Sequence, residues 1–108
     1  MSADWSALDR LRATIDSRRD ADPANSYVAR LLSRGRHKIA QKLGEEGVET
    51  ALAAVDGDNA DIVSESADLL FHLMVLWADA GIDPADVLAE LDRRADTSGL
   101  DEKAARKR

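Results

Sequence analysis

The sequence contains no cysteine, and this absence excludes a disulfide framework, a thiolate nucleophile and a cysteine-ligated zinc site. Its two histidines are too few for a histidine-based metal cage. No segment approaches the roughly 18 uncharged apolar residues that a membrane span needs. The start of the chain also lacks the basic and apolar stretches of a signal peptide. We therefore expect a cytoplasmic protein with no membrane partner.

Proline and aromatic residues are scarce as well, because the chain has two prolines and only 4% aromatic residues. It also has few of the β-branched and aromatic runs that strands prefer, whereas alanine, the best helix former, is abundant. A length of 108 residues is typical of one domain, which we place at residues 1–108. The net charge of −6 disfavours binding to nucleic acid.

Apolar residues recur at spacings of three and four, which predicts an all-α fold of four or five helices. Serine commonly caps the start of a helix, so Ser26 indicates the start of a short one. Glycine commonly follows the last residue of a helix, so Gly35 and Gly81 each indicate a helix end. Asp83, followed by proline, indicates another helix start. The polar tail from Thr97 to Arg108 is assigned no helix. The expected helices cover about residues 4–19, 27–34, 36–55, 59–80 and 84–95.

The expected helix over residues 59–80 carries one polar stripe on an otherwise apolar surface. At roughly 100° per residue, Asp61, Glu65, Asp68 and His72 fall within an arc of about 60°. A helix that is apolar around most of its circumference is normally buried on most sides. We therefore expect the stripe to face a cavity, where unpaired carboxylates would be costly unless a positive group lies beside them.

The preceding helix carries a matching stripe of charged residues, which are Lys38, Lys42, Glu45, Glu46 and Glu49. Two helices joined by a short turn run antiparallel, so the two acidic stripes are expected to converge. Carboxylate oxygens are the ligands that Mg²⁺ prefers, and Mg²⁺ commonly joins protein carboxylates to substrate phosphates. The lysines, which lie upstream on the same stripe, are well placed to bind phosphate groups. This combination favours metal-assisted hydrolysis of a phosphoanhydride.

Simpler interpretations stay open on spacing alone. Lys42 with Glu45 is also an ordinary surface ion pair, and His72 suits a partly buried histidine with satisfied hydrogen bonds. Tyr27 suits the core at least as well as a binding surface. The basic tail, with Arg106, suits solubility as well as phosphate binding. On these interpretations the chain would be a non-enzymatic helical dimerisation module.

Two segments carry a resemblance to a known group of enzymes. Glu45-Glu46-Gly47-Val48-Glu49, followed by Glu65-Ser66-Ala67-Asp68, resembles the EExxE…ExxD signature of the MazG-like, all-α nucleoside-triphosphate pyrophosphatases. Within that superfamily, residues 26–32, 38–46 and 67–76 and the closing segment 99–104 are similar to the phosphoribosyl-ATP pyrophosphatase family. The likeness covers nearly the whole chain in order.

The resemblance implies hydrolysis of phosphoribosyl-ATP to phosphoribosyl-AMP and pyrophosphate with Mg²⁺, the second step of histidine biosynthesis. It also implies a homodimer whose helices complete one another's bundles. A housekeeping pyrophosphatase acting on free or damaged nucleotides is the alternative with the same metal chemistry. By resemblance, the metal ligands are Glu46, Glu49, Glu65 and Asp68, Glu45 is a further ligand or a base, and the substrate-binding residues are Lys38, Lys42, Ser26, Tyr27, His72 and Arg106.

Overall fold

A computed structural model of the protein describes residues 4–95 and 99–106, and within these ranges it contains six α-helices and no strand. The all-α prediction is therefore confirmed. None of the helices in these ranges is long and apolar enough to cross a membrane. The helices run in the order α1 Ser6–Ser17, α2 Tyr27–Arg34, α3 Arg36–Asp56, α4 Asn59–Ala80, α5 Pro84–Arg94 and α6 Gly99–Arg106.

Most helix ends lie at the capping residues that the sequence indicates. The Ser26 hydroxyl accepts a hydrogen bond of 3.2 Å from a backbone amide in the first turn of α2. Gly35 and Gly81, which end α2 and α4, have φ angles of 89° and 73°, a region in which a side chain causes strain. Asp58 and Asp83 accept backbone hydrogen bonds at the starts of α4 and α5. Each cap depends on residues within about four positions, so the sequence locates it.

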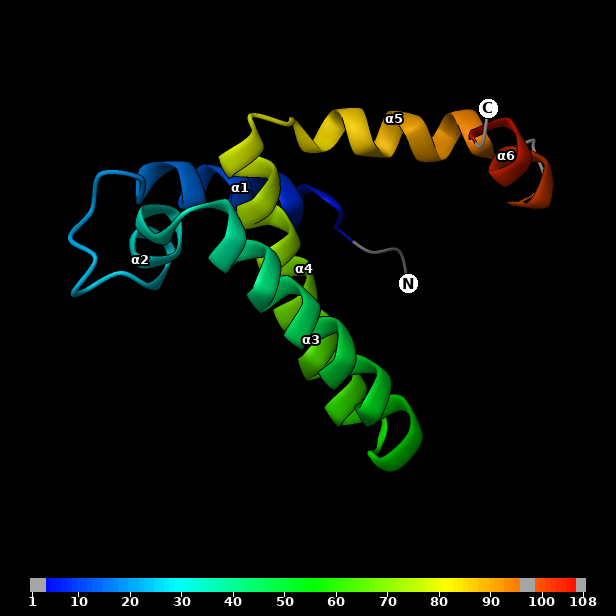
Figure 1. Cartoon of the computed structure of the whole chain (residues 1–108), viewed down its shortest axis with the longest axis horizontal. Helices are drawn as coiled ribbons and strands as arrows, with labels where there is room; N and C mark the ends of the chain where they lie inside the picture. Colours follow the sequence, from blue (N-terminus) through cyan, green and yellow to red (C-terminus); the bar gives the residue numbers. More distant parts are fainter. Residues whose placement is uncertain (1–3, 96–98, 107–108) are drawn as a thin grey trace.

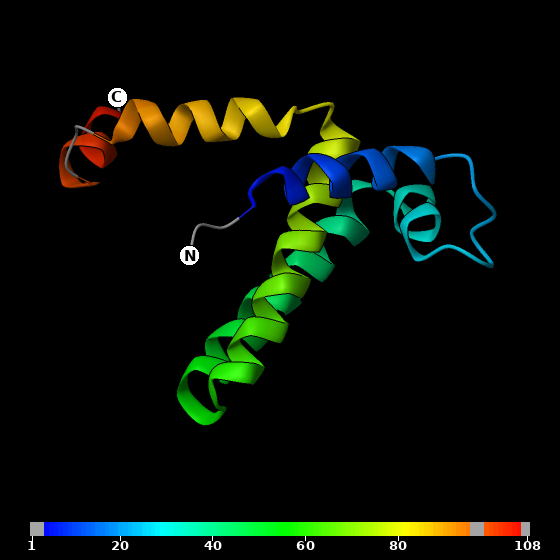
Figure 2. The same ribbon diagram turned by 180° about the vertical axis from the view of Figure 1, so that it is seen from behind.

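The helices α3 and α4 form a long antiparallel hairpin that extends well beyond the rest of the molecule (Figures 1 and 2). Only residues 57 and 58 join them. Thr50 links the two helices at mid-length. Its hydroxyl oxygen lies 2.8 Å from the carbonyl oxygen of Glu46 in α3 and 3.2 Å from that of Glu65 in α4. The hairpin therefore holds the two acidic segments side by side.

The core lies where α1 and α2 pack against the start of α3 and the C-terminal half of α4. Two arginines also bind the C-terminal end of α4 and the residues just after it. Arg19, which follows α1, donates a hydrogen bond of 2.6 Å to the carbonyl oxygen of Ala78, and Arg12 of α1 donates one to the carbonyl oxygen of Ile82. These contacts attach the N-terminal segment to the end of α4, where the last carbonyl groups of a helix lack their regular partners. The largest fully buried side chains are those of Ile15, Ile39, Met74 and Val75.

The helix α5 leads away from the hairpin and is followed at its far end by α6 (Figure 1). The sequence predicts no helix in this tail, so α6 is an addition to the predicted set. Leu100 is the only large apolar residue of α6, so the segment shows no hydrophobic period. Its alanine, lysine and arginine residues nevertheless favour a helix. Thr97, Lys107 and Arg108 lie outside the described residues.

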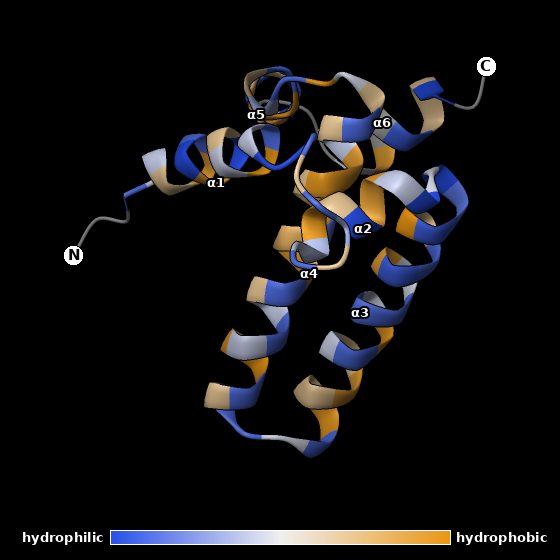
Figure 3. Ribbon diagram, turned by 90° about the vertical axis from the view of Figure 1, so that its left-hand side faces the viewer, coloured by the Kyte–Doolittle hydropathy of each residue, from blue (hydrophilic) through white to orange (hydrophobic). Residues whose placement is uncertain are grey.

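The half of the hairpin nearest the turn leaves apolar side chains exposed. Figure 3 shows hydrophobic positions along both helices as far as the turn. Our prediction that α4 is buried on most sides is wrong for the single chain, because in this half only α3 packs against it. The exposed side chains here are Val48, Leu52 and Val55 of α3 and Val63 and Leu70 of α4, which are 45% to 80% exposed.

Candidate active site on the helical hairpin

Three glutamates meet across the hairpin. Glu46 and Glu49 lie one turn apart on α3, and Glu65 lies opposite them on α4. One carboxylate oxygen from each lies within 4.8 Å of the other two. The antiparallel arrangement follows from the short turn, and it brings together residues that are 16 to 19 positions apart in the chain. The predicted convergence of the two acidic stripes is therefore observed for these three side chains.

The surroundings of these carboxylates disfavour negative charge. Burial raises the pKa of Glu46, and the neighbouring Glu49 raises it further through a hydrogen bond and its charge. Burial likewise raises the pKa of Glu65, followed by the charges of Glu49 and Asp68. Within the described part of the chain, one buried oxygen of Glu46 and one of Glu65 have no hydrogen-bond partner. A cation would supply the missing partner, and an all-oxygen donor set suits a hard divalent ion.

Asp68, the fourth predicted ligand, does not belong to the group of three within 4.8 Å. It lies one turn beyond Glu65 on α4, and its side chain is exposed. Its charge still raises the pKa values of both Glu46 and Glu65, so it lies close to the cluster. The structure thus brings together three of the four predicted ligands, with Asp68 beside them.

The predicted phosphate-binding lysines lie on α3, upstream of the three glutamates. The ammonium nitrogen of Lys42 is 3.4 Å from a carboxylate oxygen of Glu45, and that of Lys38 is 3.4 Å from the side-chain oxygen of Gln41. Hydrogen bonding from Gln41, with a further contribution from Lys42, lowers the pKa of Glu45. Glu45 therefore contacts the lysine side of the stripe and is not part of the group formed by the three glutamates.

Of the other predicted substrate-binding residues, Ser26 is buried and its hydroxyl caps α2. Tyr27 and His72 contact one another: the phenolic oxygen lies 2.8 Å from Nε2 of the imidazole. Tyr27 is 43% exposed, which corrects the interpretation that it belongs to the core, whereas His72 is buried. These two residues are 45 positions apart, and no spacing in the sequence indicates their contact. Arg106 lies on α6, far from the hairpin in Figure 1.

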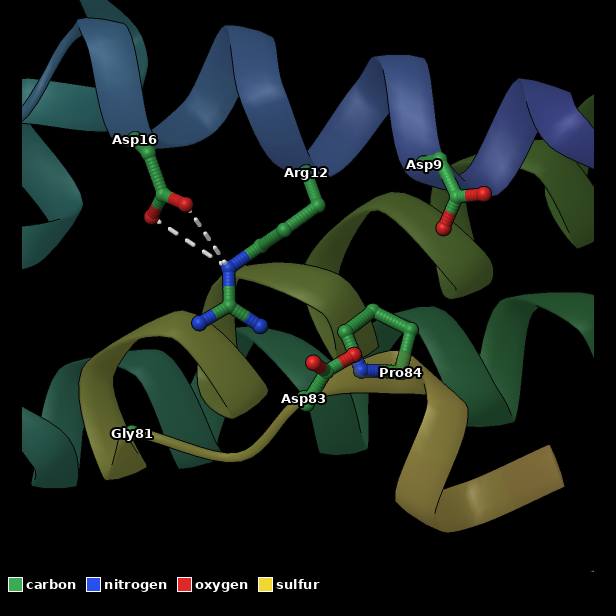
Figure 4. A pocket seen from close by; sticks show the side chains of 6 residues that line it. All are labelled: Asp9, Arg12, Asp16, Gly81, Asp83 and Pro84. Atoms are coloured by element: carbon green, nitrogen blue, oxygen red, sulfur yellow. Dashed lines mark hydrogen bonds and ion pairs between the residues drawn. The ribbon is translucent and has the colours of Figure 1, made fainter. Parts of the chain in front are cut away.

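Two hollows of about 350 Å³ occur in the described part of the chain. The first lies between α1 and the start of α5, where Figure 4 shows Arg12 pointing toward Asp16, to which it forms an ion pair of 3.2 Å. The second contains two glutamates of the cluster, so it is the candidate site. Its lining consists of Glu49, Leu52, Ala53, Asp56, Gly57, Asp61 and Glu65.

Comparison with known proteins identifies the family of the chain. The family described as phosphoribosyl-ATP pyrophosphohydrolase matches residues 8–95. A phosphoribosyl-ATP pyrophosphatase of Rhizorhabdus wittichii is 66% identical over 99 residues, which cover 92% of this chain and 93% of the relative. Relatives with the same name from Azospirillum brasilense and Parvibaculum lavamentivorans are 62% and 59% identical, over 93% and 98% of this chain and 90% and 97% of their own lengths. The chain therefore belongs to the phosphoribosyl-ATP pyrophosphohydrolase family.

Proposed function

We propose that this chain hydrolyses phosphoribosyl-ATP to phosphoribosyl-AMP and pyrophosphate, the second step of histidine biosynthesis. The observation that carries the proposal is the group formed by Glu46, Glu49 and Glu65, in a chain whose relatives are named for this activity. The proposal takes residues 1–108 as one all-α domain. It also takes the cytoplasm as the site of action, since the substrate is derived from ATP.

We propose Mg²⁺ as the cofactor, held by Glu46, Glu49 and Glu65, with Asp68 as the fourth ligand. Two buried carboxylate oxygens without partners in the described chain support this choice, because a small hard cation prefers oxygen ligands. When bound, Mg²⁺ would neutralise phosphate charge and lower the pKa of a water molecule. Without a cation, the negative charges of these carboxylates repel one another, so the cluster destabilises the folded state.

The lysines and Glu45 have complementary roles in the proposed reaction. Lys42 and Lys38 bind the phosphate groups of the substrate, and Glu45 holds the Lys42 ammonium group in position through their ion pair. A water oxygen bonds to the α-phosphorus, the bond to the bridging oxygen breaks, and pyrophosphate leaves. Glu45 is also a candidate base for the water proton, because it lies next to Glu46 on the same helix.

We further propose that the protein is a homodimer in which the exposed half of the hairpin is the contact surface. Val48, Leu52 and Val55 follow one another at spacings of four and three, so they share one face of α3. Val63 and Leu70, which are seven positions apart, share a face of α4. Apolar patches of this kind on a small domain mark interaction sites. A second copy would cover this face and enclose the adjacent glutamates.

Pyrophosphate release from phosphoribosyl-ATP tests the proposal, with Mg²⁺ and with a chelator. The wild-type protein should release pyrophosphate only when Mg²⁺ is present. Glu49→Gln should reduce the rate by about 100-fold or more while the protein stays helical, since a carboxylate that binds the ion is lost. Glu90→Gln is the matched control: Glu90 lies on α5 and pairs with Arg93, so its replacement should leave the rate unchanged.

The two alternative functions give different results in the same experiments. Rapid hydrolysis of a free nucleoside triphosphate, with no hydrolysis of phosphoribosyl-ATP, would identify a housekeeping pyrophosphatase instead. Absence of Mg²⁺ binding by calorimetry, together with changes in stability alone for Glu49→Gln and Asp68→Asn, would identify a non-enzymatic dimerisation module. Either result would contradict the proposed function.

A further inference from the structure

His72 makes two hydrogen bonds from a buried position. Its side chain is only 5% exposed. Nδ1 lies 2.8 Å from the backbone carbonyl oxygen of Asp68, one turn earlier in α4. Nε2 lies 2.8 Å from the phenolic oxygen of Tyr27, the first residue of α2. Both ring nitrogens are therefore engaged, and the imidazole connects the backbone at the acidic stripe to an aromatic residue of another helix.

The carbonyl partner of His72 fixes the direction of one of these hydrogen bonds and thereby selects a tautomer. A carbonyl oxygen only accepts, so Nδ1 of His72 carries the hydrogen atom and donates it to Asp68. In the neutral imidazole, Nε2 is then an acceptor. With this tautomer, the hydroxyl of Tyr27 donates its single hydrogen atom to Nε2. The phenolic oxygen can then still accept a hydrogen bond, but it has no second hydrogen atom to donate to another group.

Tyr27 is linked through His72 to the segment of α4 that carries Asp68. Its ring stacks on Phe71 with the centroids 6.0 Å apart, which fixes the plane of the phenol. Burial raises the pKa of Tyr27, Lys42 lowers it, and the charges of Glu46, Glu45 and Asp68 raise it. Charged residues of both helices of the hairpin therefore affect the phenol. Tyr27 is 43% exposed, so part of the residue is open to a ligand.

We propose that His72 is a positioning residue that holds the Tyr27 hydroxyl as an acceptor for an O–H or N–H group of a sugar or the base of the substrate. The proposal rests on the proposed function. A phosphate oxygen is itself an acceptor, so Tyr27 in this arrangement cannot donate to it. Sugar hydroxyls and the exocyclic nitrogen of the adenine are the substrate's donors, and none of them belongs to the phosphate groups.

Steady-state kinetics of a Tyr27 variant test whether the Tyr27 hydroxyl accepts a hydrogen bond from the substrate. Tyr27→Phe keeps the stacked ring and removes the acceptor, so KM for phosphoribosyl-ATP should rise roughly three- to tenfold. The value of kcat should change by less than about twofold, because the contact is not specific to the transition state. Competitive inhibition by inorganic tripolyphosphate, which offers no such donor, should be unchanged. Weakened inhibition by tripolyphosphate would overturn the proposal, since it would place Tyr27 on a phosphate group.

Variants of His72 test whether it acts through Tyr27. His72→Leu should raise KM as Tyr27→Phe does, and should have no further effect on KM in the Tyr27→Phe background. His72→Gln, which offers an acceptor oxygen to the phenol, should restore part of the affinity. A purely structural histidine would instead give equal losses in both backgrounds, and Gln would not restore KM, which would overturn the proposal.

The tautomer of His72 provides a test that does not depend on activity. Nitrogen-15 NMR of the wild-type protein should show the hydrogen atom on Nδ1, and Tyr27→Phe should change the Nε2 signal. A hydrogen atom on Nε2 would reverse the contact with Tyr27 and overturn the proposal. An inactive wild-type protein with the Nδ1–H tautomer would refute the proposed function instead. An active one in which Tyr27→Phe leaves KM unchanged would refute this inference alone.

Discussion

Replacing Thr50 by valine would remove the one hydroxyl group that touches the backbone at both Glu46 and Glu65. Valine keeps the branched shape of threonine, so the change removes hydrogen bonding with little change in volume. A typical hydrogen bond contributes about 1 kcal/mol net to stability. A loss of that size lowers the melting temperature of a domain of about 100 residues by roughly 4–8 °C.

Thr14→Val is the matched control for this experiment. The hydroxyl of Thr14 also bonds to the carbonyl oxygen four residues earlier, that of Arg10, at 3.0 Å, but it is exposed and the structure shows no second helix at this contact. The control should change the free energy of unfolding by less than about 0.5 kcal/mol. The difference between the two variants therefore isolates the hydrogen bond from Thr50 across the hairpin.

Thermal and urea unfolding at one fixed protein concentration would measure both variants, because self-association would make stability depend on concentration. Thr50→Val should also weaken Mg²⁺ binding, since its hydroxyl helps to fix the distance between the helices that carry Glu46 and Glu65. Equal stability losses in Thr50→Val and Thr14→Val would show that the contact between the helices contributes nothing, and would refute the reasoning.

Three further predictions follow from the same structure. Without metal, the urea midpoint should rise as the pH falls from 7 toward 5. The pKa values of Glu46 and Glu65 are raised above their ordinary value of 4.5 in the folded state, so the folded state takes up protons at a higher pH than the unfolded state does. A midpoint that does not change with pH would contradict this. Ser26→Ala should cost about 1 kcal/mol in unfolding experiments and leave KM unchanged, whereas Ser33→Ala on the same helix should be close to neutral; a raised KM for Ser26→Ala alone would instead show substrate binding. Leu52→Lys, at a position 56% exposed in the single chain, should yield monomers in analytical ultracentrifugation, and an unchanged dimer would place the contact surface elsewhere.

Local interactions explain which parts of the fold the sequence could predict. The glycines at positions 35 and 81 adopt backbone angles that other residues avoid, and the capping side chains bind amides within the adjacent turn. These effects act over about four residues, so the helix ends can be located from the sequence. The helix α6 was missed because its residues lack an apolar period, and hydrophobic periodicity is the main signal of a helix.

Periodicity and a short turn act locally, so the sequence alone predicts an all-α protein with glutamates on matching stripes of two consecutive helices. Which of these glutamates meet depends on how the two helices pack. Packing set the register of the hairpin, so Glu46, Glu49 and Glu65 form the cluster, while Glu45 pairs with Lys42. It also placed Tyr27 against His72 across 45 residues. Contacts of this kind depend on how distant side chains pack together, and no spacing along one helix encodes them.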